Sequence, residues 1–532
     1  MKQFDLIIIG GGITGAGIAL EATLIGLKVG LFEKNDFASG TSSKSTKLIH
    51  GGLRYLKNGE IGLVWKTAKE RKSIKKLAPN LVFEEKMLVP ISTNSSFNRF
   101  TLKIGLTIYD FLAGVKKQEK HHMLSKEETL LLEPMLDDRK LKAGGIYTEY
   151  RCDDSRLVIA VLKTAQKLGA ELFNYTEVVG FEYDANKKVV GINTQSEISN
   201  SNSQYFSPVI INATGAWLDL VRKLENQLEQ PKLKLSKGIH LVFPYNKLPI
   251  KQNLYFEASD QRMIFCIIRQ GKIYVGTTDT HFPLIDDSLH PSSTDIEYLL
   301  AELKLTFPEY PLILQDIEST WTGLRPLIFD GKSNTSDISR KDQLFVSPAG
   351  LVNIAGGKLT GFLGMAKQVI KFLKTRNSKF AISPAIVAHF DGCEFQHDEE
   401  IIDYIISQTG ESKQIGGNYQ TISRLVHCYG KKTEIIVDIA FNLWPNEVDK
   451  HLVLWKAEIL YTIKNEWVKT PSDFWIRRSN TLYFNKPNLV VLFNSTWGWF
   501  STELKLSAKK KTEMEYDFLK ELDLTLNFNS KF

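Results

Sequence analysis

The sequence lacks several features that would place it in a specialised class of protein. Its 532 residues contain four scattered cysteines and no C-x-x-C pair, which argues against a disulfide scaffold or a metal site and favours buried free thiols in a reducing compartment. The longest apolar stretch, residues 102–115, contains Lys103 and Asp110, so we expect no helix that spans a bilayer. No block of interleaved basic and aromatic residues is present, so we expect no nucleic-acid partner.

The bulk composition is that of a large globular protein with a mild excess of positive charge. Sixty-seven Lys and Arg stand against 60 Asp and Glu, which suits anionic substrates or an anionic membrane surface but is equally common in soluble basic proteins. With 43% hydrophobic residues, the chain predicts two or three domains. Because the N-terminus leads directly into a predicted strand, we expect no signal peptide and a cytoplasmic protein.

A glycine-rich turn near the N-terminus is the most informative stretch. Residues 6–9 are apolar and mostly β-branched, as in a buried parallel strand, and they are followed by Gly10, Gly12 and Gly15 in a G-x-G-x-x-G pattern. A helix is predicted from Ile13 to Thr23, and its N-terminus offers free N–H groups to phosphates. The motif alone is weak evidence, because such patterns also arise in ordinary βαβ turns.

An acidic residue after the second predicted strand supports a dinucleotide-binding role for the glycine-rich turn. A second predicted strand, residues 27–32, ends at Glu33, about eighteen residues after Gly15, where a carboxylate meets the ribose hydroxyls of an adenine dinucleotide. The alternative is a structural turn with a surface glutamate. We therefore expect a dinucleotide site.

The segment that follows carries the resemblance to a known family. Residues 36–56 mix hydroxyls, glycines and cations without a helix or strand period, which favours a loop that contacts phosphate and flavin. The sequence TSSKSTKLIHGGLRYL within it closely resembles FAD-dependent glycerol-3-phosphate dehydrogenases, the quinone-linked aerobic enzymes, and their glycerophosphate oxidase relatives. The resemblance continues over nearly the whole chain.

The resemblance implies a fold of class α/β plus α+β. A Rossmann-like FAD-binding domain is expected in residues 1–80, 144–220 and 351–383. An antiparallel-sheet substrate-capping domain of the glycine/D-amino-acid oxidase type is expected in 81–143 and 221–350. Residues 384–532, which include the aromatic anchors of 474–478, resemble the all-α C-terminal domain of the family.

Several local patterns fit this scheme. Residues 144–156 read as a strand that enters a helix capped by Asp154 or Ser155. Residues 170–173 and 176–180 read as paired strands, 184–188 as a hairpin and 196–203 as a surface loop. Residues 209–217 resemble the flavoprotein motif in which an apolar strand ends in Ala-Thr-Gly, although a plain buried strand is the alternative. Residues 236–350 alternate as in an antiparallel sheet, and a helix over 361–373 is expected to direct its dipole at the flavin.

Two segments have an uncertain environment. The apolar residues between 97 and 109 suit either a membrane-facing lip or a core. The end of the chain, with Lys509–Lys511 followed by residues 514–524, suits either an amphipathic helix for a membrane or a partner, or a frayed exposed helix.

The cofactor contacts implied by the motifs and the resemblance surround FAD. They are Gly10, Gly12, Ile13, Thr14, Gly15, Glu33, Thr41, Ser42, Ser43, Lys47, Leu48, His50, Gly51, Gly52, Val178, Ala213, Gly215, Gly356, Gly357, Lys358, Leu359 and Thr360.

The implied reaction oxidises sn-glycerol 3-phosphate to dihydroxyacetone phosphate by hydride transfer from C2 to flavin N5. His50 is the first candidate for the base and His240 the second, with a core histidine as the alternative for His240. Arg325 and Lys358 are expected to stabilise the developing oxyanion. The remaining substrate contacts are Arg54, Tyr55, Arg340, Thr278 and Asp279, because a phosphate dianion needs guanidinium donors. The family continues Thr-Tyr-Arg after Lys-Leu, whereas this chain has Gly361-Phe362-Leu363 after Thr360, so no Tyr or Arg acts there.

The fate of the electrons is predicted from the resemblance alone. A membrane quinone is expected, with the protein peripheral on the inner face of the cytoplasmic membrane and assembled as a homodimer. The oxidase relatives that use oxygen carry an insertion in the capping region, and none is obvious here. Two other classes are an amine- or hydroxyacid-oxidising flavoenzyme of the same fold and a flavin-binding protein without catalysis.

Overall fold

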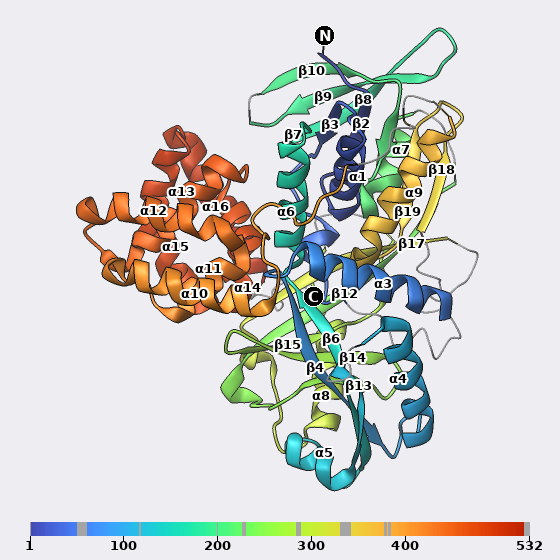
Figure 1. The fold of residues 1–532 in the computed structure, drawn as a ribbon, viewed down its shortest axis with the longest axis vertical. Helices are drawn as coiled ribbons and strands as arrows, with labels where there is room; N and C mark the ends of the chain where they lie inside the picture. The colour runs from blue at the N-terminus through green and yellow to red at the C-terminus, as the bar shows by residue number, and fades with distance from the viewer. Residues whose placement is uncertain are drawn as a thin grey trace.

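The computed structural model describes residues 2–49, 61–115, 119–198, 200–225, 230–283, 289–329, 342–376, 380 and 385–525. In these residues the chain forms a parallel sheet with helices, a large antiparallel sheet below it, and a helical part to one side (Figure 1). The four cysteines are free thiols. Among the described helices, none combines the length and the apolar character needed to cross a bilayer.

The parallel sheet contains the N-terminal strand and gives the molecule its dinucleotide-binding core. Its order is β18 (Asp342–Val346), β19 (Val352–Gly356), β11 (Ile210–Asn212), β2 (Leu6–Ile9), β3 (Val29–Phe32) and β7 (Glu171–Phe173), and only the β18–β19 pair is antiparallel. Both faces are covered, as its continuous apolar strands require. Leu6 and Ile8 pack with the helices, whereas Ile7 and Ile9 pack against a second sheet.

The helices on the first face bring the start and the end of this fold together. Helix α1 (Ile13–Leu24) lies against α6 (Asp154–Lys167) and α9 (Phe362–Lys374). The cap of α6 is Asp153, whose carboxylate accepts a hydrogen bond from the Arg156 N–H at 3.3 Å. The expected caps, Asp154 and Ser155, are instead the first two residues of the helix. This correction leaves Asp154 available for an ion pair described below.

The sheet on the second face contains β1 (Lys2–Gln3), β10 (Ser201–Phe206), β9 (Val189–Ser196) and β8 (Thr176–Tyr183) in that order. The predicted pairing of residues 170–173 with 176–180 is wrong, because β7 joins the parallel sheet and β8 joins this one. The chain changes sheet at Tyr175, where φ is +52°. The predicted hairpin at 184–188 is confirmed, but much of the predicted loop 196–203 is strand.

The large, mainly antiparallel sheet holds the other side of the site. Its order is β16 (Thr280–His281), β12 (Leu233–Pro244), β15 (Lys272–Gly276), β14 (Met263–Arg269), β13 (Asn253–Glu257), β4 (Val82–Ser92), β6 (Leu141–Cys152) and β5 (His122–Ser125), and β17 (Ser319–Ile328) also pairs with β12. Only the β13–β4 pair is parallel. The β12–β17 ladder places Arg325 opposite Ser236 and Gly323 opposite Gly238. Strand β6 passes unbroken through residues 143 and 144, so the domain division expected there stays a proposal.

Helices cover parts of this sheet and include one that the alternation pattern did not predict, α8 (Ser293–Thr306). The others are α3 (Ile61–Leu77), α4 (Arg99–Ala113) and α5 (Lys126–Leu132). Leu102, Leu106 and Tyr109 of α4 are buried, whereas Phe100 and Ile104 are exposed. The segment therefore has both a core face and an outward apolar face.

The C-terminal part is all helical. Its helices are α10 (Asp398–Ser412), α11 (Tyr419–Tyr429), α12 (Thr433–Leu443), α13 (Val453–Asn465), α14 (Thr481–Phe484), α15 (Lys486–Glu503) and α16 (Ala508–Leu524). Both alternatives for the end of the chain are corrected, because Met514, Phe518 and Leu522 of α16 are buried in the same cluster as residues of α15. A π-helical turn, η13 (Asp473–Arg478), lies between α13 and α14.

Candidate active site

A cavity of about 610 Å³ extends from the ends of the parallel strands to strands β12 and β17. One end is lined by Glu33, Val178 and the glycine-rich turn, which we call the cofactor end. The other end is lined by Gly238, His240 and Arg325, which we call the substrate end. The volume lies within the range of about 300–1,000 Å³ typical of ligand pockets.

The glycine-rich turn is shaped by close backbone contacts. A Cβ on Gly15 would lie 1.9 Å from the Gly10 carbonyl oxygen, and a Cβ on Gly10, where φ is +109°, would lie 2.7 Å from the Ala213 oxygen. The N-cap of α1 is Gly12, and the Ile13 N–H donates to Ser42 Oγ at 3.0 Å. The helix N-terminus therefore opens to the cavity with glycines and a hydroxyl, a cradle suited to a pyrophosphate.

Glu33 lies at the end of β3, next to this turn. Its Oε2 accepts a hydrogen bond from the Gly11 N–H at 2.7 Å, and its Oε1 accepts one from the Asn35 N–H at 2.9 Å. Burial raises the pKa of Glu33 above its ordinary value, against the lowering effect of these two backbone donors. The carboxylate is thus fixed in the cavity wall, where a ribose hydroxyl can donate to it.

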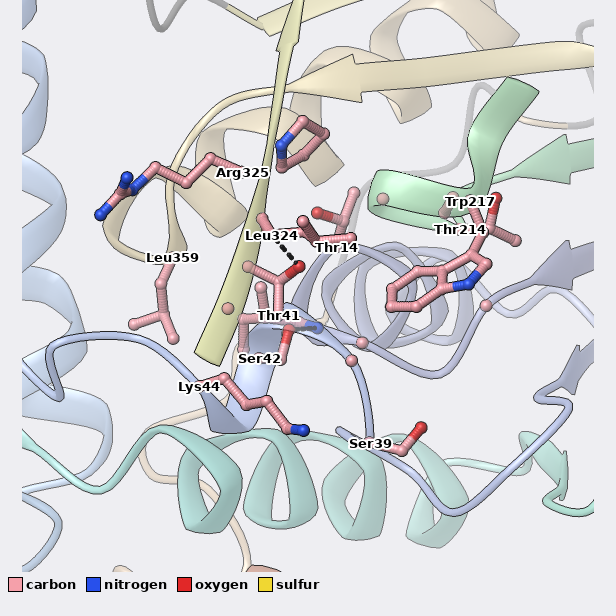
Figure 2. A pocket seen from close by; sticks show the side chains of 18 of the residues that line it. Thr14, Ser39, Thr41, Ser42, Lys44, Thr214, Trp217, Leu324, Arg325 and Leu359 are labelled. Atoms are coloured by element: carbon pink, nitrogen blue, oxygen red, sulfur yellow. Dashed lines mark hydrogen bonds between the residues drawn. The ribbon is translucent and has the colours of Figure 1, made fainter. Parts of the chain in front are cut away.

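The opposite wall of the cavity is built from two further strand ends. Ala213, Thr214 and Gly215 follow β11. Gly356 ends β19, and Gly357 through Thr360 lead through the turn η7 (Leu359–Gly361) into α9. A Cβ on Gly357, where φ is +78°, would lie 2.4 Å from Met365 Sδ. Lys358 lines the cavity at this position. Figure 2 shows Thr214 and Trp217 on one side of the pocket and Leu359 on the other.

Arg325 is held at the substrate end by backbone and hydroxyl acceptors. Its Nη1 donates to the Thr278 carbonyl at 2.9 Å and its Nη2 to Thr277 Oγ1 at 2.8 Å. A Cβ on Gly238 would lie 2.3 Å from Nη2, so only glycine leaves room for this guanidinium. Thr278 and Asp279, which we expect to bind substrate, do not line the cavity; they lie behind Arg325, with Asp279 Oδ1 at 3.6 Å from Nη1.

His240 is wedged between aromatic and glycine neighbours. Its ring stacks on Trp321 with centroids 4.6 Å apart, and its Nε2 lies 3.0 Å from Thr46 Oγ1. Burial, and then the charges of Arg325 and Lys47, hold the pKa of His240 well below its usual range, so the ring is neutral at neutral pH. A neutral imidazole can accept a proton, but the same surroundings oppose the imidazolium that would form.

Three of the expected cofactor contacts do not line the cavity. Lys47 is fully buried and pairs with Asp154 at 2.6 Å, and it donates to the Ser43 carbonyl at 3.1 Å. Ser43 and Gly15 do not line the cavity either, so the contacts of these three residues with the cofactor stay predictions. Gly10, Gly12, Ile13, Thr14, Thr41, Ser42, Leu48 and Val178 do line it.

Several predicted site residues lie outside the described residues. These are His50, Gly51, Gly52, Arg54, Tyr55 and Arg340. The structure therefore describes part of the predicted substrate end, and the roles of these six residues stay predictions.

The structure also adds residues to the cavity wall that were not among the predicted site residues, including Lys44, Thr46, Trp217 and Gly238. Burial lowers the pKa of Lys44. Trp217 faces Gly40, where a Cβ would lie 2.8 Å from the indole ring. A glycine inside an otherwise regular strand, as at Gly238, is the one signal that pointed to a close approach.

The residues present fit an adenine dinucleotide with a redox-active ring. The glycine cradle, the helix N-terminus and Glu33 match its pyrophosphate and ribose, and a positively charged wall lies at the far end. No cluster of three metal-ligating side chains occurs among the residues that the structure describes. Fold and cavity together define a dinucleotide-dependent oxidoreductase with a parallel-sheet cofactor domain and an antiparallel capping sheet.

Comparison with known proteins identifies the family. The model of the FAD dependent oxidoreductase family matches residues 5–369, and that of the C-terminal domain of alpha-glycerophosphate oxidase matches residues 398–511. The chain belongs to the FAD dependent oxidoreductase family, and its cofactor is FAD. Its predicted fold class is confirmed.

Individual relatives give a closer match. The aerobic glycerol-3-phosphate dehydrogenase of Staphylococcus aureus is 42% identical over 489 residues, which covers 91% of this chain and 88% of the relative. The crystal structure of the glycerol-3-phosphate dehydrogenase from Bacillus halodurans complexed with FAD superposes with a TM-score of 0.84 at 32% identity, covering 100% of this chain and 97% of that one. The FAD-bound L-alpha-glycerophosphate oxidase of Mycoplasma pneumoniae shares the fold, with a TM-score of 0.55 at 20% identity over 70% of this chain and 95% of its own.

Proposed function

We propose that this chain is an FAD-dependent glycerol-3-phosphate dehydrogenase that converts sn-glycerol 3-phosphate to dihydroxyacetone phosphate. One observation carries the proposal: a cavity with a dinucleotide cradle at one end has Arg325 and Lys358 in its wall, in a chain 42% identical to aerobic glycerol-3-phosphate dehydrogenases over 91% of its length. A doubly negative phosphate and a hydroxyl that becomes negative on oxidation both favour cationic neighbours.

FAD, when bound, supplies the hydride acceptor, N5 of the flavin. The protein must then orient C2 of the substrate and remove the proton of its hydroxyl. Arg325 and Lys358 stabilise the negative charge that develops on this oxygen, and Arg54 with Arg340 bind the phosphate. The bonds from Arg325 to Thr278 and Thr277 fix the guanidinium before the substrate arrives, so no reorganisation is needed during the reaction.

His50 remains the proposed base, and His240 is the second candidate. The low pKa of His240 and its stacking on Trp321 favour a role in shaping the substrate end. A His50→Asn variant should reduce its flavin far more slowly than the parent. An unchanged rate of flavin reduction in a stopped-flow experiment would transfer the base role to another residue.

The substrate is tested by an anaerobic titration of the yellow holoenzyme. Adding glycerol 3-phosphate should bleach the flavin absorption, whereas glycine and lactate should leave it unchanged. Bleaching by glycine or lactate instead would indicate an amine- or hydroxyacid-oxidising enzyme of the same fold. A yellow protein that no substrate bleaches would indicate a flavin-binding protein without this catalysis.

We infer that the electrons pass to a membrane quinone and that the protein docks on the inner face of the cytoplasmic membrane through α3 and α4. Phe100 and Phe111 of α4 are 70% and 84% exposed, with Ile104 between them and the exposed Lys103 beside them. Helix α3, which packs against α4, presents Trp65, Lys69, Lys72 and Lys76 outward. Aromatic and aliphatic side chains flanked by lysines suit the boundary of an anionic bilayer.

The membrane proposal is tested by flotation with vesicles. The parent should bind phosphatidylglycerol vesicles and bind phosphatidylcholine vesicles weakly. A Phe100→Ser/Phe111→Ser variant should lose most of this binding, whereas Val448→Ser, which removes a 96% exposed apolar side chain on the C-terminal part, should retain it. Equal binding by both variants would contradict the docking surface.

Oxygen as the acceptor is distinguished by readmitting it after the bleaching titration. Slow recovery of the flavin colour in oxygen, with peroxide forming only at that slow rate, and fast recovery with a soluble quinone supports the dehydrogenase. Rapid peroxide formation would make the chain an oxidase. The homodimer is tested separately by light scattering on the holoenzyme.

A further inference from the structure

A buried ionic contact joins the C-terminal helices to the loop that follows β3. We call residues 33–42 the cofactor loop, because they run from Glu33 to Ser42 and both ends line the cofactor end of the cavity. Asp36, in the middle of this loop, is fully buried. Its partners are Arg477 and Arg478 of η13, more than 440 positions later in the sequence.

The contact is a bidentate ion pair with a third hydrogen-bond donor. Arg478 donates from Nη1 to Asp36 Oδ2 at 2.9 Å and from Nη2 to Asp36 Oδ1 at 3.0 Å, and Arg477 Nε donates to Oδ2 at 2.6 Å. Burial alone raises the pKa of Asp36, but the two guanidinium groups outweigh it and hold the pKa below its ordinary value. Such a bidentate geometry fixes the orientation of a carboxylate as well as its charge.

The π-helical turn explains how two consecutive arginines reach one carboxylate. In η13 the Ser479 N–H donates to the Phe474 carbonyl at 2.9 Å, five residues back. This wider turn changes the angle between successive side chains, and such turns occur frequently at functional sites. Asp473 of the same turn accepts hydrogen bonds from Arg477 Nη2 at 2.7 Å and from the Tyr175 hydroxyl at 2.6 Å.

The cofactor loop transmits this contact to the glycine-rich turn. Phe37 fills the space beside Gly11, where a Cβ would lie 2.5 Å from its ring, and the Ala38 N–H donates to the Gly11 carbonyl at 3.1 Å. Phe37 also meets the edge of Trp467 from the C-terminal part, with ring centroids 5.2 Å apart. The loop is thus held between the turn that faces the pyrophosphate and the helices of the C-terminal part.

We propose that the C-terminal helical part belongs to the FAD-binding apparatus, with Arg477 and Arg478 as positioning residues that hold the cofactor loop in the shape that binds adenosine and pyrophosphate. The proposal rests on FAD as the cofactor of the family and not on the identity of the substrate. A protein that binds FAD tightly but is not bleached by glycerol 3-phosphate would contradict the proposed function and leave this inference intact.

The test compares two arginine-to-lysine variants of the full chain. Arg478→Lys keeps the charge but loses the fork on Asp36. Arg424→Lys is the matched control. Arg424, on α11, forms a bidentate ion pair with the buried Glu458 of α13, at 2.8 and 2.5 Å, and does not contact the cofactor loop. Each protein is stripped of FAD and titrated with it, and the quenching of flavin fluorescence gives the Kd. Circular dichroism and the Tm of the stripped protein report the fold.

Arg478→Lys should raise the Kd for FAD at least tenfold, and Arg424→Lys less than twofold, when the losses in Tm of the stripped proteins are similar. Excess FAD should restore the flavin absorption of Arg478→Lys. A Kd within twofold of the parent for Arg478→Lys, or an equal rise in both variants, would overturn the proposal.

A second variant covers the case in which Arg478→Lys does not fold. Trp467→Leu removes the edge contact with Phe37 without leaving a buried charge unpaired. It should raise the Kd for FAD at least threefold with a native circular dichroism spectrum. An unchanged Kd in this folded variant would equally overturn the proposal.

Discussion

The two ends of the cavity are built in opposite ways. At the cofactor end, the glycine-rich turn supplies backbone N–H groups, and the missing side chains of Gly10 and Gly15 allow the close backbone contacts that shape it. At the substrate end, strands far apart in the sequence supply charged and aromatic side chains, and each is held by neighbours behind it, as Arg325 is held by Thr277 and Thr278. The first end is therefore sensitive to added atoms, and the second to lost hydrogen bonds and charges.

The largest effect is expected at the substrate end. Arg325→Lys should lower kcat/KM for glycerol 3-phosphate by about 10²–10³, because a lysine cannot bond Thr277 and Thr278 and present a charge to the substrate oxygen at the same time. The flavin absorption should be unchanged. Arg262→Lys is the control, just before strand β14 of the same sheet, where the arginine pairs with Asp260 and stacks on Tyr298 outside the cavity; this variant should stay within about twofold of the parent. A parent-like kcat/KM in Arg325→Lys would remove this residue from the proposed mechanism.

At the cofactor end, adding a single methyl group should be enough to weaken both folding and FAD binding. Gly15→Ala places a Cβ against the Gly10 carbonyl and should cost about 1–3 kcal/mol of stability together with most of the FAD affinity. The control Gly498→Ala lies inside α15 with open space around the new methyl group and should stabilise that helix by up to about 1 kcal/mol. Differential scanning calorimetry with and without FAD measures both. A Gly15→Ala protein as stable and as yellow as the parent would contradict the difference drawn between the two ends.

The smallest effect concerns Glu70 of α3, whose carboxylate lies at the start of α9. Burial raises the pKa of Glu70 to about 7. Because the folded state then binds a proton more tightly than the unfolded state, this group adds most stability at acid pH and loses it as the pH rises from about 4.5 to 7. Glu70→Gln should remove roughly 1–2 kcal/mol of that pH dependence, allowing for solvent screening. Urea unfolding at pH 5 and pH 8 tests this, and identical pH dependence in both proteins would contradict it.

The difference between the ends also explains what the sequence could predict. The turn, Glu33 and the strand that ends at Ala213 are local patterns, so their place in the wall follows from spacing. Thr278 and Asp279 have the right chemistry for a substrate site, but a residue type does not reveal whether a side chain faces the cavity or supports Arg325 from behind.

Other features depend on partners distant in the sequence. Residues 176–183 alternate like a strand, but alternation cannot tell which sheet the strand joins, and the change of direction at Tyr175 separates β7 from β8. The contact of Arg477 and Arg478 with Asp36 could not be predicted either, because an arginine pair usually lies in solvent. Only the fold brings them to Asp36.

The order of strands in the parallel sheet has a consequence for biosynthesis. Its neighbours β11, β2 and β19 come from the middle, the beginning and the last third of the chain, and the cavity wall extends from Ile9 to Thr360. During translation the first βαβ unit therefore leaves the ribosome long before the strand that completes its sheet. Its apolar strand edges stay unpaired and exposed during this interval. FAD can be enclosed only after most of the polypeptide has been made, so we expect nascent fragments that end before β19 to need chaperone protection and to emerge colourless.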